Sequence, residues 1–257
     1  MLILIAESKT MLDEQTPVSP EEQKDNQPAG EAGAERIMEG LEKLSQGELI
    51  ATTVFSASLA GRLRQEIYEF SNKAVGIKAI EAYTGVVFKA LQYDSLPEAA
   101  RAMCGKDVRI VSSLYGLLRP DDIIKPYRLD FTTKAAPGGA TLSAFWKKDT
   151  TIQLVRTLQD QGQTEILNLL PGDAAKFIDW KLVKRFCKVW KADFVEITDG
   201  GQAKTPSASK LKTMRGKLLR AILCDGIARV ADVKEIQSDD FMYDGTPVYP
   251  DHLQFVC

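Results

Sequence analysis

Short apolar runs alternate with longer amphipathic stretches along this chain. Residues 1–6 form an apolar run that ends at a polar turn, and this pattern predicts a buried strand. Ile37 opens a series of apolar residues at helical spacing. Ser45 begins an S-x-x-E capping box, and Ser56 can cap a further helix whose apolar stripe ends at Phe70. The first quarter of the chain therefore predicts one strand followed by three helices.

The same alternation continues to the end of the chain. The pattern predicts strands at 108–111, 165–170 and 194–198, and helices at about 73–81, 97–104, 143–161, 179–191 and 209–230. Four or five short strands are few for a doubly wound fold. We therefore predict a mixed α+β fold, a compact single unit over residues 1–257 with a small sheet and several helices. Residues 13–33, rich in Pro, Gly, Gln and acidic residues, predict a surface excursion.

The amino-acid composition limits the classes of protein to which this chain can belong. Apolar residues make up 44% of the chain, which is enough for a sizeable core, and no apolar run reaches 18 residues. The apolar opening lacks a basic leader and a cleavage site, so we expect a cytoplasmic protein without a membrane partner. The four cysteines form no CxxC pair, and His252 is the single histidine. We therefore expect no metal site and no cofactor, and no obligate protein partner is evident.

The net charge of −2 hides an uneven distribution of charge. Residues 1–50 contain eleven acidic and four basic residues, whereas residues 176–220 contain twelve basic and four acidic residues. Such asymmetry favours a surface that faces a polyanion. The alternative is a set of solvated helix faces, in which these charges have no binding role.

One segment combines arginines, tyrosines and prolines in a way that no regular helix or strand explains. It is VSSLYGLLRPDDIIKPYRLDF, residues 111–131, and it directly follows a predicted strand. Gly116 permits a sharp turn, and the prolines stiffen the loop that presents Arg119 and Arg128. Guanidinium groups on a stiff loop favour an anion site. Equally open is a structural corner in which both arginines pair with nearby aspartates.

A second segment, YTGVVFKAL at residues 83–91, has the shape of a helix-hairpin-helix connection. A glycine turn there would let backbone N–H groups approach a phosphate. The usual double glycine is missing, so an ordinary break between two helical pieces is the alternative.

Several of these motifs occur in an order that resembles a known family. They are MLILI with SKT, SLYGLLRPDDIIKPYRLDF, Phe145–Trp146, Asn168–Leu169, and the K-x-x-R-G pattern of 212–216. Together they resemble the YaaA family of bacterial peroxide-stress proteins from residue 1 to about 245. LYGLLRP followed by PYRL is the most specific element.

The resemblance implies a fold particular to that family, with a helix-hairpin-helix-like element and a basic cleft that binds DNA without sequence preference. It also implies a role in limiting damage from hydrogen peroxide and free iron. Site residues carried over by the matching motifs are Lys9, Thr10, Tyr83, Gly85, Tyr115, Arg119, Tyr127, Arg128, Lys176, Lys212 and Arg215. Lys184, Arg185 and Lys188 join them as the densest part of the basic tract, which Trp180, Phe186 and Trp190 interleave.

The chain departs from the family pattern at three places. Ala6-Glu7-Ser8 stands where the family usually has Ser-Pro-Ala before the lysine, and Asp173-Ala174 replaces the usual Glu-Tyr. Thr246-Pro247-Val248 stands in place of a serine-rich motif near the C-terminus.

Two functions follow as hypotheses. The first is non-sequence-specific DNA binding through residues 176–220, with Arg119 and Arg128 shaping an anion pocket. The second is an enzyme that acts on a phosphorylated nucleotide or a damaged base in a cationic pocket shared by Lys9, Arg119, Arg128, Lys212 and Arg215. In that pocket Asp130 or Asp173 would be the base and Lys9 or Lys212 a conceivable nucleophile. No catalytic residue is assigned, and any effect on iron is expected to be indirect.

Overall fold

The first strand forms the centre of the main sheet. In the computed structural model, which describes residues 1–12, 16–17, 19–72, 75–245 and 249–257, strand β1 (Leu2–Ala6) pairs in parallel with β4 (Val108–Ser112) on one side and β7 (Glu165–Asn168) on the other. All residues of β1 and β4 are buried. A central parallel strand is covered on both faces, which explains why both read as continuous apolar runs.

The main sheet is larger than the sequence predicts. Its order is β10-β11-β8-β7-β1-β4-β5, with β9 paired to β8. The strands that were not predicted are β5 (Gly116–Leu118), β9 (Ala203–Lys204), β10 (Met242–Tyr243) and β11 (His252–Val256). The strand predicted at 194–198 is present as the end of β8 (Lys188–Ile197), which begins well before it. The predicted small sheet is therefore wrong. The strands that were missed are mostly short, or lie in a C-terminal segment whose turns and acids mask a weak alternation.

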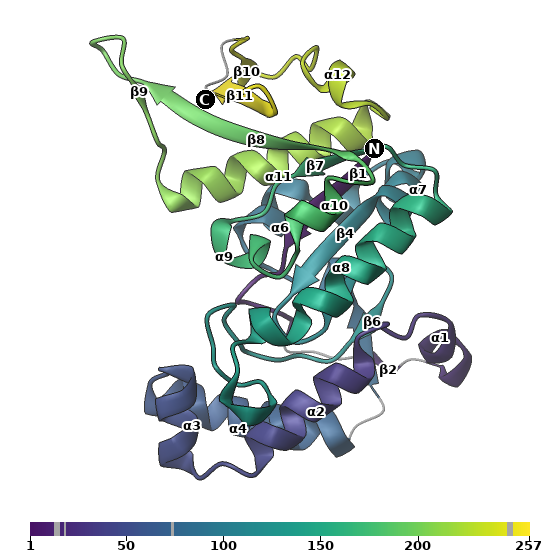
Figure 1. The fold of residues 1–257 in the computed structure, drawn as a ribbon, viewed down its shortest axis with the longest axis vertical. Helices are drawn as coiled ribbons and strands as arrows, with labels where there is room; N and C mark the ends of the chain where they lie inside the picture. The colour runs from purple at the N-terminus through teal and green to yellow at the C-terminus, as the bar shows by residue number, and fades with distance from the viewer. Residues whose placement is uncertain (13–15, 18, 73–74, 246–248) are drawn as a thin grey trace.

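A helical region occupies the other end of the molecule (Figure 1). It contains α2 (Glu31–Glu42), α3 (Gln46–Thr53) and α4 (Ala57–Asn72), with α1 (Pro20–Asp25) to one side. The capping box of Ser45 and Glu48 is present, as predicted. A small antiparallel sheet of β2 (Thr16–Pro17), β3 (Val75–Lys78) and β6 (Ile123–Ile124) joins this region to the rest.

Two predictions about the N-terminal half need correction. The helix expected at 73–81 is β3 followed by the short α5 (Ala79–Ala82), and residues 73–74 lie outside the described residues. The excursion expected at 13–33 lies partly outside them as well, and α1 and the start of α2 form in the rest of it. Gly30 in this segment is buried against the backbone of Tyr115. A Cβ at this position would come within 1.9 Å of the Tyr115 carbonyl oxygen, so no larger residue fits.

The remaining helices surround the main sheet. They are α6 (Val86–Leu91), α7 (Glu98–Asp107), α8 (Leu142–Asp160), α9 (Gly172–Ala175), α10 (Trp180–Val183), α11 (Ala208–Cys224) and α12 (Val230–Val233), with 3-10 turns at Tyr93–Ser95 and Pro137–Gly139. Helix α8 packs against β5 and α10, whereas α11 packs against α6 and α7. Figure 1 shows α8 running along the sheet beside β4. A mixed α/β architecture is thus confirmed.

The helix predicted at 179–191 is wrong in most of its length. Helix α10 ends at Val183, and the chain enters β8 at Lys188. Ala192 and Phe194 are buried while Asp193 between them is partly exposed, which is the two-residue period of a strand. The spacing of apolar residues over 179–191 is locally that of a helix. Pairing of β8 with both β7 and β11 overrides that local pattern.

The pair of short helices around Gly85 is present, but a helix-hairpin-helix unit is not confirmed. Helix α5 has only four residues, and Gly85 has an ordinary negative φ as the N-cap of α6. The glycine instead permits a close approach, since a Cβ there would lie 2.1 Å from the Ser8 hydroxyl oxygen. Thr84 N–H also donates to the Thr10 carbonyl at 2.9 Å, which fastens this turn to the segment after β1.

Contact between α11 and α6 gives a prediction about stability. A Cβ at Gly216 would lie 2.3 Å from the Val87 carbonyl oxygen and 2.7 Å from the Ala90 Cβ. We expect Gly216→Ala to lower the free energy of unfolding by about 1–3 kcal/mol, because the two backbones must separate. The matched control is Gly61→Ala in α4, where nothing lies within 4 Å, and a gain of up to about 1 kcal/mol is expected. Urea unfolding of both variants measures this, and equal effects would contradict the close packing.

Candidate functional site

A cavity of about 400 Å³ opens where several segments meet beyond the end of β1. Residues 5–10 follow this strand into the cavity wall, and Leu169 and Pro171 follow the neighbouring β7. The carboxyl ends of parallel strands form a natural ligand crevice, because the chain leaves the sheet there in different directions. Three further segments complete the wall: residues 85–88 of the α6 turn, 129–131 of the proline-stiffened loop, and Lys212 with Arg215 from α11.

Glu7 is the charged group most tightly held in this wall. Its Oε2 accepts a hydrogen bond from the Ser113 N–H at 2.9 Å and another from the Tyr127 hydroxyl. The Tyr127 hydroxyl also lies 2.7 Å from the hydroxyls of Tyr83 and Ser112. A chain of buried hydroxyl groups therefore begins at the Glu7 carboxyl and extends through Tyr127 to Tyr83 and Ser112.

Burial controls the acidity of this chain. It raises the pKa of Glu7 to about 7, and the hydrogen bonds from Ser113 and Tyr127 only partly offset that rise. Burial also raises the pKa of Tyr83 and Tyr127 well above the usual range, and the nearby Glu7 adds to this effect. Near neutral pH the tyrosines thus stay protonated as donors, while Glu7 exists in both forms.

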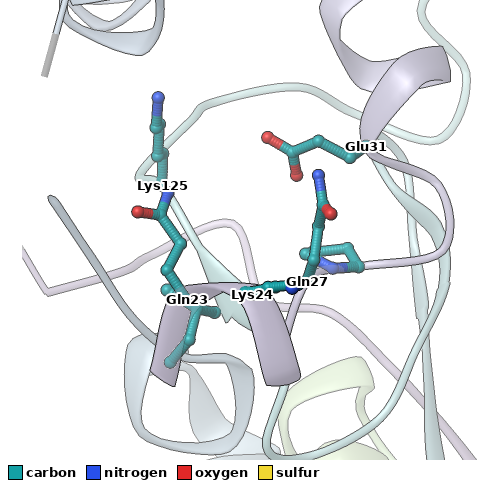
Figure 2. Close-up of a pocket in the computed structure, with 7 residues that line it drawn as sticks. Gln23, Lys24, Gln27, Glu31 and Lys125 are labelled. Atoms are coloured by element: carbon teal, nitrogen blue, oxygen red, sulfur yellow. The ribbon is translucent and has the colours of Figure 1, made fainter. Parts of the chain in front are cut away.

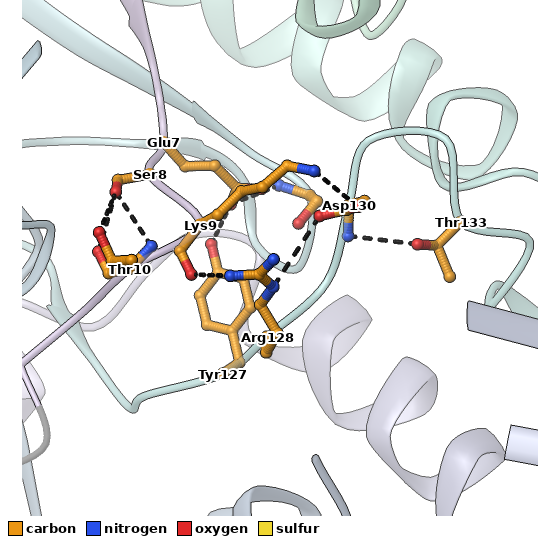
Figure 3. Close-up of polar contacts among 9 residues, drawn as sticks. Glu7, Ser8, Lys9, Thr10, Tyr127, Arg128, Asp130 and Thr133 are labelled. Carbon is orange, nitrogen blue, oxygen red and sulfur yellow. Dashed lines mark hydrogen bonds and ion pairs between the residues drawn. The ribbon is translucent and has the colours of Figure 1, made fainter. Parts of the chain in front are cut away.

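A second carboxylate in the same cavity has ionic partners. The Lys9 ammonium donates to Asp130 Oδ2 at 2.7 Å, and the Arg128 guanidinium lies 4.0 Å from Asp130 Oδ1. Figure 3 shows the Arg128 guanidinium donating to the Lys9 carbonyl, with the Lys9 side chain reaching over to Asp130. Arg128 therefore positions the Lys9 segment, and the carboxyl groups of Glu7 and Asp130 stand in different electrostatic surroundings.

The cations from α11 are the least neutralised charges of the cavity. Arg215 Nε is buried without a hydrogen-bond partner among the described residues, and burial lowers the pKa of this guanidinium. Lys212, one turn earlier, is exposed and forms no ion pair within the described part of the chain. A buried donor without a partner costs free energy unless a ligand satisfies it. This pair is therefore suited to an anion.

The structure brings together only part of the predicted site. Lys9, Thr10, Gly85, Lys212 and Arg215 line the cavity, as do Asp130 and Asp173. Tyr83 and Tyr127 lie behind Glu7, and Arg128 lines an adjoining hollow that shares Lys9 and Thr10. Lys176 lies at the edge, with its ammonium 2.8 Å from the Asp173 carboxylate.

Arg119 does not belong to this site, so the predicted pocket shared by Lys9, Arg119, Arg128 and Arg215 is wrong. Strand β5 runs antiparallel to β4 and carries the chain back to the amino end of the sheet. There Arg119 Nε donates to Asp122 Oδ1 at 2.7 Å, and its guanidinium also reaches the Asp25 carbonyl. For Arg119 the alternative of a structural corner is the correct one.

Tyr115 is a core residue rather than a surface contact. It is fully buried, and its hydroxyl accepts a hydrogen bond from the Lys125 N–H at 3.1 Å. Its ring packs near Phe70 and edge-on to Tyr127. Gly116 beside it has a φ of +75°, which confirms the predicted sharp turn. The family resemblance implied a site residue here, but the apolar strand on each side of Tyr115 indicates burial.

The basic tract does not form one continuous surface. Its ion pairs within the described residues are Lys176–Asp173, Lys184–Asp251, Lys191–Asp193, Lys210–Glu196 and Lys217–Asp240. The Lys188 ammonium lies over the Trp190 ring, 3.7 Å from its centroid. Lys188 opens β8, so it and the preceding Lys184 and Arg185 lie at the amino end of the parallel strands, opposite the cavity. The strand at 188–197 thus separates charges that a single helix would have gathered.

A second cavity, of about 260 Å³, contains none of the predicted site residues. Gln23 and Lys24 of α1, Gln27, Glu31 of α2, and Lys125 line it together with Pro28 and Ile123. Figure 2 shows Lys125 and Gln23 on one side, facing Glu31 and Gln27 on the other. Burial raises the pKa of Glu31. The Lys125 ammonium is already engaged, because it donates to the Phe70 carbonyl.

Within the described ranges, no group of three or more His, Cys, Asp or Glu side chains is placed to hold a metal ion. In the same part of the chain, no helix combines the length and apolarity needed to cross a bilayer.

Glu7 was missed as a site residue, although the sequence carried a signal for it. A charged side chain directly after a buried strand lies at the edge of the sheet where ligands bind in α/β proteins. In the sequence, Glu7 stands out only as a departure from the family motif. Its hydrogen-bond partners, Ser113 and Tyr127, lie more than 100 residues away and could not be assigned from the pattern.

The raised pKa of Glu7 predicts a dependence of stability on pH. The folded protein keeps a proton on Glu7 between pH 4.5 and about 7, where the unfolded chain has lost it. The contribution of Glu7 to the free energy of unfolding is therefore complete below pH 4.5 and lost as pH rises to about 7. Glu7→Gln should gain up to about 3 kcal/mol relative to wild type between pH 5 and 8, as measured by urea unfolding.

A control variant should behave in the opposite way. Hydrogen bonds from Ser45 lower the pKa of the exposed Glu48, so Glu48→Gln should lose stability relative to wild type as pH rises toward 4.5, and the loss should then stay constant. A Glu7→Gln difference that stays flat with pH would show that this carboxyl is solvated like an ordinary surface group.

Comparison with known proteins places the whole chain in one family. A family model described as "Peroxide stress protein YaaA" matches residues 1–246. A UPF0246 protein of Parabacteroides distasonis is 31% identical over 245 residues, which cover 95% of this chain and 94% of the relative. A UPF0246 protein of Shewanella loihica is 30% identical over 247 residues, which cover 95% and 93%. The chain therefore belongs to the YaaA family of peroxide stress proteins, as its sequence motifs indicated.

Proposed function

We propose that this protein acts in the peroxide-stress response by binding DNA, and that a phosphorylated nucleotide unit enters the cavity beyond β1. The observation that carries the proposal is the pair of cations on α11. Arg215 has a buried Nε without a partner, and Lys212 lies beside it without an ion pair among the described residues. A phosphate would satisfy both, since guanidinium and ammonium groups are the usual phosphate partners.

The rest of the cavity suits the uncharged part of a nucleotide. Its volume of about 400 Å³ falls within the usual range for small-molecule sites, roughly 300–1,000 Å³. Phe88, Leu129 and Phe131 contribute apolar surface against which a planar base or a sugar can pack. A ligand with one anionic end and one flat apolar end therefore matches the lining.

DNA is the proposed partner because it is rich in phosphates, and because the family is described as one of peroxide stress proteins. Binding would be without sequence preference and would weaken as salt concentration rises. In this proposal the turn between α5 and α6 approaches the backbone as a helix-hairpin-helix-like element, since Gly85 lies in the cavity wall. Contact with DNA also implies a cytoplasmic location. In this proposal the protein limits iron-dependent damage indirectly, because it covers the DNA and does not bind the iron.

A second function, an enzyme acting on a phosphorylated nucleotide or a damaged base, is favoured by one specific observation. The cavity contains the carboxyl groups Glu7 and Asp130 in contrasting surroundings, hydroxyl donors around one and cations around the other. In acid–base sites, two carboxyl groups typically lie in environments that favour different protonation states.

Charge changes at the two ends of the sheet test the proposed binding site. We expect Lys212→Glu combined with Arg215→Gln to weaken binding to a short single-stranded or duplex oligonucleotide by at least about tenfold at 0.1 M salt. The dependence of log K on log salt should become shallower by about one to two units. Fluorescence anisotropy over a salt series measures both quantities.

The matched control is the triple variant Lys184→Glu, Arg185→Glu and Lys188→Glu. It changes more charge, but its residues lie at the opposite end of the strands, so the affinity should stay within about threefold of wild type. If the triple variant loses binding and the α11 variant retains it, the basic tract is the DNA surface and the cavity is not.

A further inference from the structure

We propose that Glu7 is the acid–base catalytic residue of a hydrolysis carried out in this cavity, on a phosphorylated nucleoside or nucleotide unit that Lys212 and Arg215 hold by its phosphate. The inference rests on the proposed function, because it requires that the cavity binds such a ligand. It adds a reaction, and it assigns the proton transfer to a residue that the family motif does not contain.

The position of Glu7 suits proton exchange with a ligand. Glu7 belongs to the cavity wall. Its carboxyl is fixed by the Ser113 N–H at 2.9 Å and by the Tyr127 hydroxyl. Glu7 thus combines a place in the wall with a carboxyl that is held by neutral donors and forms no ion pair within the described residues.

The partners of Glu7 allow both of its protonation states. The groups that hydrogen-bond it are neutral hydroxyls and a backbone N–H, which support a carboxylate without the permanent charge of a direct ion pair. The charged groups that share the cavity are Lys9, Asp130, Asp173, Lys212 and Arg215. Burial raises the pKa of Glu7 to about 7, so an acid and a base form are both available near neutral pH.

Asp130 has a different role in the same wall. Its Oδ2 accepts from the Lys9 ammonium at 2.7 Å, and Arg128 approaches its other oxygen. These contacts hold the carboxylate charge and also position the Lys9 segment that follows Glu7. Asp130 is therefore a positioning residue, and the proton transfer falls to Glu7.

The step balances without an oxidant or a metal. The protonated Glu7 donates its proton to the leaving nitrogen or oxygen of the ligand as the bond to that atom breaks. Water adds its oxygen to the other atom of the broken bond, and the proton released by the water returns to Glu7. While Glu7 is a carboxylate, the Ser113 N–H and the Tyr127 hydroxyl stabilise it. The products together gain one molecule of water.

The experiment uses the full chain and a defined set of probes. The probes are the four deoxynucleoside 5′-monophosphates and short oligonucleotides containing normal, deaminated or oxidised bases. Binding is measured by calorimetry and product formation by mass spectrometry, for wild type, Glu7→Gln and Glu7→Asp. We expect wild type to hydrolyse at least one probe that it binds. Glu7→Gln should lower kcat by about 100-fold or more while Kd changes less than about threefold, and Glu7→Asp should restore part of the rate.

A pH profile separates catalysis from a structural role. If the protonated form of Glu7 is the acid, kcat should fall as pH rises through about 7, and Glu7→Gln should lack this limb. Tyr127→Phe removes a donor to the carboxylate, so the limb should move to higher pH. Circular dichroism confirms that each variant is folded.

The outcomes distinguish the inference from the function on which it rests. Binding of probes without any turnover by wild type, or equal turnover by Glu7→Gln, would overturn the role of Glu7 and leave the binding site intact. Absence of binding to every probe would overturn the proposed function and this inference together.

Discussion

The parallel pairing of β1 with a strand on each side is the constraint on which the rest of this structure depends. Because β4, β1 and β7 point the same way, the segments that follow them leave the sheet at one edge. Glu7, Ser113 and Leu169 are brought to that edge by backbone hydrogen bonding and not by any preference of their own. The burial of β1 on both faces fixes its register, since a shifted strand would disturb two ladders at once.

Close helix packing then completes the cavity. Helix α11 approaches α6 at Gly216, where no side chain separates the backbones, and this contact carries Lys212 and Arg215 to the cavity wall. On the other side Gly85 lets the α6 turn approach Ser8. Two glycines therefore set the distance between the segment after β1 and the cations that face it. The apolar lining and the charges come from elements that meet only because these approaches are possible.

Ion pairs formed in the tertiary structure determine which cations of this protein are available to a ligand. The density of basic residues along the sequence does not. Most lysines of the basic tract have acidic or carbonyl partners, often from distant segments such as Asp240 and Asp251. Exposed pairs of this kind contribute little to stability, but they reduce the local field available to a polyanion. Arg215 differs because burial keeps its guanidinium from water and the described residues leave its Nε unpaired. One buried cation with an unpaired donor is therefore stronger evidence for an anionic ligand than several exposed cations, which water solvates.

Local rules determined much of this protein from its sequence alone. The apolar first strand, the Ser45 capping box, the stripe of α4 and the turn at Gly116 were predictable, because each depends on neighbours in the chain. The motifs also indicated the family, and they singled out Lys9, Lys212 and Arg215, which line the cavity.

Only the tertiary structure decided the rest. Residues 188–197 became a strand because β7 and β11 were available to pair with it on both sides. Arg119 moved to the opposite end of the sheet because β5 turns back along β4. Glu7 gained its partners from Ser113 and Tyr127, far along the chain. In each case the deciding interaction joins residues that are distant in sequence, so hydrophobic period and residue type could not specify it.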